Sequence, residues 1–94
     1  MNNPTDLLVS LKQQLEAAEA YTVTHRAWLK GYNVAGERGL IDAGCPVLLA
    51  DELNRSLAGA AAVLRRHIAS AVKHATGLKK RIAGLERWIA KQAA

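Results

Sequence analysis

A seven-residue repeat in the second half of the chain constrains the fold more than any other feature. Leucine or alanine recurs every seven residues from Leu57 to Leu85, and isoleucine or alanine recurs in a second column from Ala61 to Ile89. The two columns fill the d and a positions of four heptads in unbroken register, a pattern typical of a helix that packs in a coiled coil. The repeat predicts one long helix over residues 46–91.

A second apolar stripe predicts a shorter helix over residues 5–30. Its members are spaced by three or four residues from Leu8 to Leu29, which places them on one helical face. The stripe turns polar near its end, where we expect His25 to be a hydrogen-bonded position. Gly31 follows the stripe, and a glycine in that place usually ends a helix.

The segment between the two predicted helices, residues 31–46, contains four of the seven glycines. This composition predicts a loop, with Leu40 and Ile41 as its buried anchors. A chain of 94 residues is the size of one small domain. We therefore expect a single all-α domain over residues 1–94, built as a helical hairpin with a long C-terminal coiled-coil helix.

The predicted helix lengths do not match. At a rise of about 1.5 Å per residue, the first helix would be about 39 Å long and the second about 69 Å. The hairpin would then leave an apolar stripe exposed beyond residue 72, which marks an interaction surface. We expect this stripe to self-associate and make a homodimer, parallel or antiparallel, through Leu78, Ile82, Leu85 and Ile89. A break near Gly77 that folds the tail back as a third helix, and coverage by a partner protein, are the alternatives.

Positive charge is concentrated in the C-terminal part of the chain. Residues 1–56 have a net charge of −2, whereas residues 57–94 have a net charge of +7. Four cations occupy successive f positions, opposite the apolar columns, and three more flank them; the seven are Arg66, Lys73, Lys80 and Arg87, then Arg65, Lys79 and Arg81. Such a row suits the phosphates of nucleic acid or an acidic protein surface. A merely solvated face is the alternative.

Two tryptophans flank the predicted apolar stripes. Trp28 and Trp88 both occupy positions beside the helix contact rather than within it. Tryptophan at the rim of a surface often carries much of the binding energy. Both are therefore candidate anchors for a partner, and the alternative is that they edge the core.

Residues that could support catalysis are sparse. Cys45 is the single cysteine, which excludes an internal disulfide and a cysteine-based zinc cluster. His67 and His74 are separated by about 10 Å along one helix, too far to hold one metal ion. No nucleophile–base pair or phosphate-binding loop can be assembled. We expect no catalytic residue, metal, cofactor or small-molecule substrate, and the chain is not predicted to be an enzyme.

The remaining sequence features predict a cytoplasmic protein. No apolar run approaches the roughly 20 residues of a membrane span, and the first residues lack the basic and apolar stretches of a signal peptide. The predicted function is that of a small helical interaction protein that binds a larger macromolecular partner, in the manner of accessory or inhibitor proteins of phages and mobile elements. A nucleic-acid-binding coiled-coil dimer is the alternative.

Overall fold

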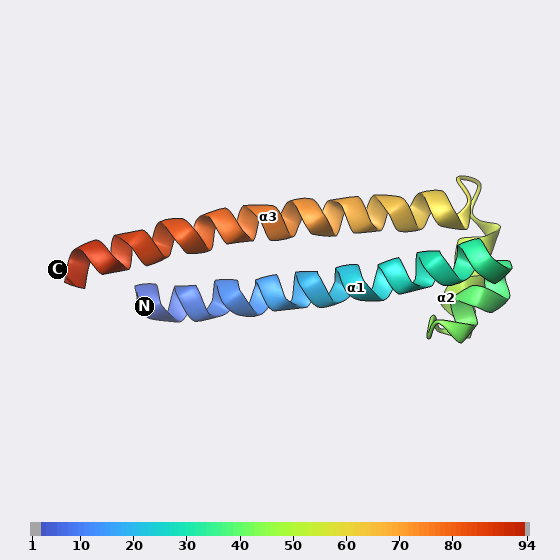
Figure 1. Ribbon diagram of the computed structural model, residues 1–94, viewed down its shortest axis with the longest axis horizontal. Helices are drawn as coiled ribbons and strands as arrows, with labels where there is room; N and C mark the ends of the chain where they lie inside the picture. Colours follow the sequence, from blue (N-terminus) through green and yellow to red (C-terminus); the bar gives the residue numbers. More distant parts are fainter. Residues whose placement is uncertain (1–2, 94) are drawn as a thin grey trace.

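The computed structural model describes residues 3–93, in which there are three α-helices and no strand. They are α1 (Pro4–Asp42), α2 (Val47–Arg55) and α3 (Ala60–Ala93). The long helices α1 and α3 lie side by side and antiparallel, and the short α2 packs at the end where the chain turns (Figure 1). The predicted all-α fold is confirmed.

The helix α1 begins at Pro4, one residue before the predicted start, and continues well past residue 30. Asn3 caps its first turn, because its Oδ1 accepts a hydrogen bond of 2.8 Å from the backbone N–H of Asp6. The helix then bends at Ala35 and Gly36, whose backbone angles are not helical. Gly36 has a φ of 61°, which glycine adopts without the steric cost that other residues pay.

The bend explains why the predicted loop over residues 31–46 is wrong. Residues 37–42 fold back on the preceding turn, and Gly39 lies against Gly31. A Cβ atom on either glycine would overlap the backbone carbonyl of the other. Gly31 therefore does not end the helix; it lies inside α1, where its missing side chain permits this close contact. The predicted anchor Leu40 is fully buried in the folded-back segment, and Ile41 is half-buried.

The single helix predicted over residues 46–91 is divided in two. The segment 56–59 separates α2 from α3, and Leu57, the first d position of the repeat, is fully exposed there. In contrast, α3 runs unbroken through Gly77, so the break considered near that residue is not present. A Cβ atom added at Gly77 would meet no other described atom within 4 Å, so this glycine costs only about 1 kcal/mol of helix propensity.

The two long helices match in length, so the expected apolar overhang does not exist. Residues 4–34 of α1 rise about 46 Å and α3 rises about 51 Å. The seam of α3 is covered by α1 of the same chain: Leu78 and Ile82 form a buried cluster with Leu11. The prediction of an exposed stripe beyond residue 72 was wrong because it placed the turn of the hairpin too early in the chain.

The core has two dense ends and a thin middle. At the turn, Trp28, Leu40 and Leu64 belong to a buried cluster that α2 completes with Ala50 and Leu53. The second cluster lies near the other end, around Leu11, Leu78 and Ile82. Between them the buried residues are small or polar: Ala18, Thr22, His25, Ala71 and Ala75. The molecule is 56 Å long but only 21 and 18 Å across, so each long helix keeps an outer face in solvent.

Candidate functional site

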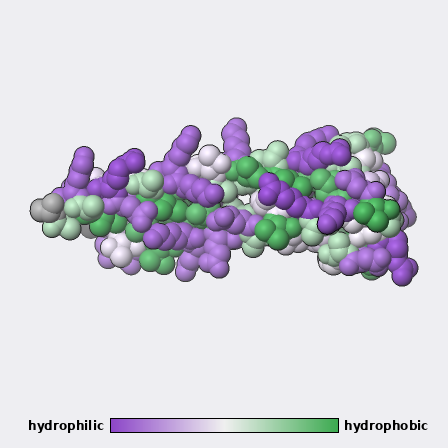
Figure 2. All heavy atoms as spheres, in the orientation of Figure 1, coloured by the Kyte–Doolittle hydropathy of each residue, from purple (hydrophilic) through white to green (hydrophobic). Residues whose placement is uncertain are grey.

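The outer face of α3 carries the predicted cations. Arg66, Lys73, Lys80 and Arg87 are all exposed, and together they form what we call the outer row. Because α3 is continuous, the row is unbroken over about 31 Å and points away from the contact with α1. Hydrophilic side chains project from this upper edge of the molecule in Figure 2, above the apolar band between the helices.

The three cations that flank the outer row lie on different sides of it. Arg81 lines a shallow hollow of α3 together with Lys73. Lys79 instead lines a groove between α3 and α1, and helical geometry places Arg65 on that same side. The structure therefore places Arg81 with the row on one side, and separates Arg65 and Lys79 from it on the other.

None of these seven cations is neutralised by a carboxylate within residues 3–93. The three ion pairs found there join Lys12 to Glu86 at 3.6 Å, Arg38 to Asp42, and Arg55 to Asp51. Glu86 is the one acidic residue of α3, and it pairs with α1. The positive charge of the outer row is thus uncompensated by the fold.

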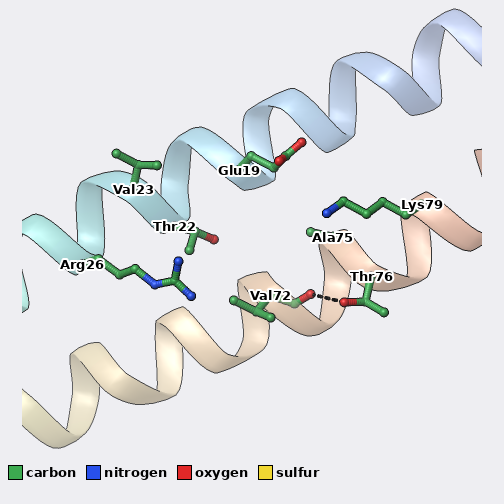
Figure 3. A pocket seen from close by; sticks show the side chains of 8 residues that line it. All are labelled: Glu19, Thr22, Val23, Arg26, Val72, Ala75, Thr76 and Lys79. Atoms are coloured by element: carbon green, nitrogen blue, oxygen red, sulfur yellow. Dashed lines mark hydrogen bonds between the residues drawn. The ribbon is translucent and has the colours of Figure 1, made fainter.

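The groove between the long helices was not predicted from the sequence. Glu19, Thr22 and Arg26 of α1 line it opposite Ala75 and Lys79 of α3, and the side chains of Arg26 and Lys79 point into it from opposite helices (Figure 3). It opens beside the thin middle of the core, where small side chains leave space. The alanines of both helices were its sequence signal.

The two hydroxyl groups that line this groove are hydrogen-bonded to the backbone. The hydroxyls of Thr22 and Thr76 each donate to a carbonyl oxygen one turn earlier on their own helix, at 2.9 and 3.0 Å. A nucleophile needs an adjacent base to activate it. These two hydroxyls are instead committed to backbone bonds.

The two tryptophans have different environments. Trp28 is buried in the cluster at the turn, so it belongs to the core, which is the alternative stated for it, rather than to a surface open to a partner. Trp88 is 48% exposed and lines an apolar hollow at the opposite end with Pro4, Leu7 and Leu85. Only Trp88 is therefore placed to contact a partner.

The four residues predicted to self-associate lie along the seam with α1. Leu78 and Ile82 are buried by that helix, and Leu85 and Ile89 are half-buried. Their apolar surface is thus largely used within the chain. The exposed overhang from which the homodimer was predicted is absent from the described residues.

Histidine and cysteine side chains have structural environments. His25 is buried, and its Nδ1 donates to the carbonyl oxygen of Tyr21 at 2.9 Å, as expected for a hydrogen-bonded seam position. Its ring stacks on Tyr21 at 3.7 Å and lies 5.9 Å from the ring of His67. Burial raises the pKa of the Cys45 thiol above its ordinary value. Across residues 3–93, no group of three or more His, Cys, Asp or Glu side chains could hold a metal ion.

Comparison with known proteins identifies no relative of this chain. No protein-family model matches the chain, and searches of curated proteins and of solved structures also return no match. Within the described part of the chain, none of the helices is long and apolar enough to cross a membrane.

Proposed function

We propose that the protein is a non-enzymatic helical interaction protein, and that the outer face of α3 binds an anionic surface of a larger macromolecular partner. The observation that carries this proposal is the outer row. It presents four exposed cations of one sign over about 31 Å, and none of them is paired with an acid in residues 3–93. The opposite side of the same helix is used to fold.

The charge balance of the hairpin supports this function. Solvated helix faces usually mix charges of both signs, because neighbouring like charges repel one another. In α3 the single acid, Glu86, lies outside the row and pairs with Lys12 of α1. A row of like charges therefore costs some stability in the free protein, and an anionic partner would remove that cost.

Two classes of partner fit different parts of the surface. The exposed ring of Trp88 and the apolar hollow beside Leu7 suit a protein, because interfaces between proteins are anchored by buried aromatic side chains. The even spacing and single sign of the outer row suit the phosphates of a nucleic acid. An acidic protein surface and a nucleic acid are the two candidate partners.

A capture experiment tests the proposal. The wild-type protein and a variant with Arg66, Lys73, Lys80 and Arg87 all changed to Gln would be immobilised and exposed to lysate of the source cells. Bound protein would be identified by mass spectrometry and bound nucleic acid by staining. We expect a partner that the wild type retains at 50 mM salt and the variant loses. Equal retention by both proteins would contradict the proposal.

A further inference from the structure

A shallow hollow, which we call the furrow, lies on the exposed side of α3 next to the outer row. Ser70 and Gly77 are the small residues that line it, and helical geometry places Gly84 on the same line, seven residues further along. Lys73 and Arg81 line the same hollow as Gly77, one on each side of it. The furrow thus has a cation on each side of Gly77, which itself has no side chain.

Little of the described chain lies above the two glycines, Gly77 and Gly84. A Cβ atom added at Gly77 would meet no described atom within 4 Å, and one added at Gly84 would meet only the guanidinium of Arg87, at 3.9 Å. Glycine in the middle of a helix is nevertheless destabilising compared with alanine. Gly31 and Gly39 show the contrast, since backbone of the same chain fills their space. The space above Gly77 is open to a ligand from outside, and at Gly84 the only approach is that of the flexible end of Arg87.

The side chains around the furrow favour charge recognition over an apolar interface. Lys73 lines the furrow on one side of Gly77, and His74 and Arg81 line it on the other. Helical geometry places Lys80 and Arg87 further along the side of Lys73. Lysine is depleted at the centre of protein interfaces, where aromatic and apolar residues dominate. Trp88 is the one large exposed apolar residue near the furrow, and it lies at the end of it. Arg87 already leans over Gly84, where its guanidinium could meet an anion.

We infer that this furrow binds the phosphodiester backbone of a nucleic acid duplex without reading its sequence. Cations spaced by about 10 Å on a straight helix match a regular polyanion, and phosphate contacts carry no sequence information. The furrow offers no Asn or Gln, the side chains that recognise adenine in the major groove. It also lacks the row of aromatic side chains on which single-stranded bases stack. The inference rests on the proposed function, because it names the partner of the same face.

Binding to short labelled DNA duplexes tests the inference directly. Fluorescence anisotropy would measure the affinity for two 20-base-pair duplexes of unrelated sequence between 50 and 200 mM salt. Four phosphate contacts, from Lys73, Lys80, Arg81 and Arg87, predict equal affinity for both duplexes and a log–log salt slope of about −3.6. A strong preference for one sequence would overturn the inference.

A matched pair of variants tests the furrow itself. Gly77→Gln with Gly84→Gln fills the furrow without changing the charge, and we expect the duplex affinity to fall about tenfold or more as phosphates are held away from the cations. The thermal midpoint should rise, because Gln is a better helix former than Gly. Ala83→Gln with Ala90→Gln places the same side chains seven residues apart on the opposite flank of the row, and should leave the affinity unchanged.

Three further results would overturn the inference, and they have different consequences for the proposed function. Unchanged duplex affinity in the glycine variant would show that the furrow is not the site. Binding to poly-L-glutamate in the absence of duplex binding would exclude nucleic acid but leave the proposed anionic partner standing. Failure to bind either polymer, together with no partner in the capture experiment, would contradict both.

Discussion

At the scale of single residues, the glycines of this chain have opposite roles. Gly39 packs on the backbone of Gly31, whereas Gly77 faces solvent. We expect Gly39→Ala to destabilise the fold by about 1–3 kcal/mol, because the added methyl group forces the backbone apart. Gly77→Ala should instead stabilise it by up to about 1 kcal/mol. Chemical denaturation of the two variants measures both values, and a stable Gly39→Ala variant would disprove the close contact.

The thiol of Cys45 gives the fold a dependence on alkaline pH. Burial raises the pKa of this thiol in the folded state. As the pH rises above about 8.5, the unfolded chain loses the thiol proton first, so the free energy of unfolding should decrease. Below that pH both states keep the proton, and the stabilising effect is fully present. Denaturation from pH 7 to 10 would show the decrease in the wild type, and a smaller decrease in Cys45→Ala.

At the scale of the helix, the two sides of α3 should be separable by mutation. Leu78 is 2% exposed and packs against Leu11, so Leu78→Ala should cost about 2–5 kcal/mol. Neutralising the whole outer row with Gln should change the stability by less than about 1 kcal/mol, because the row has no partner in the fold. Thermal and urea unfolding compare the two. A large loss of stability in the row variant would show that the row has a structural role.

Heptad spacing in the sequence predicted the buried face of α3 correctly but misplaced the turn of the hairpin. Heptad spacing depends only on local geometry, so it correctly placed Leu64, Leu78 and Ile82 on one buried face. Heptad spacing could not place the turn of the hairpin. Whether the helix ends at Gly31 depends on its contact with Gly39, and that contact forms because the chain bends between the two residues. The apolar overhang was a consequence of that one error.

The candidate surface was also predicted only in part. The positions of the outer row follow from the period of the helix, and the structure confirms their exposure. The difference between Trp28 and Trp88 could not be predicted, because α2 buries the first and no sequence pattern showed where α2 would pack. The furrow was missed because Gly77 was considered only as the place of a possible break in the helix.

At the scale of the whole molecule, the hairpin covers its own seam. A dimer through Leu78 and Ile82 would require α1 to leave α3, so we expect a monomer. Light scattering should give a mass near the 10.1 kDa of one chain. Twice that mass would restore the homodimer predicted from the sequence and would indicate an exchange of helices between two chains.

Binding should depend on where the positive charge lies, rather than on how much of it the protein carries. Two variants separate the effect of position from the effect of total charge. One changes the outer row, Arg66, Lys73, Lys80 and Arg87, to Gln; the other changes four cations of the first half, Arg26, Lys30, Arg38 and Arg55, to Gln. Both lose the same charge, so general attraction to an anion falls equally.

The decisive measurement is the affinity of these two variants and the wild type for the captured partner at 50 and 200 mM salt. We predict that the outer-row variant loses most of the affinity, and that the loss is larger at 50 mM, where charge is less screened. The first-half variant should bind nearly as well as the wild type. Equal affinities for the two variants at both salt concentrations would contradict the claim that the outer face of α3 is the binding surface.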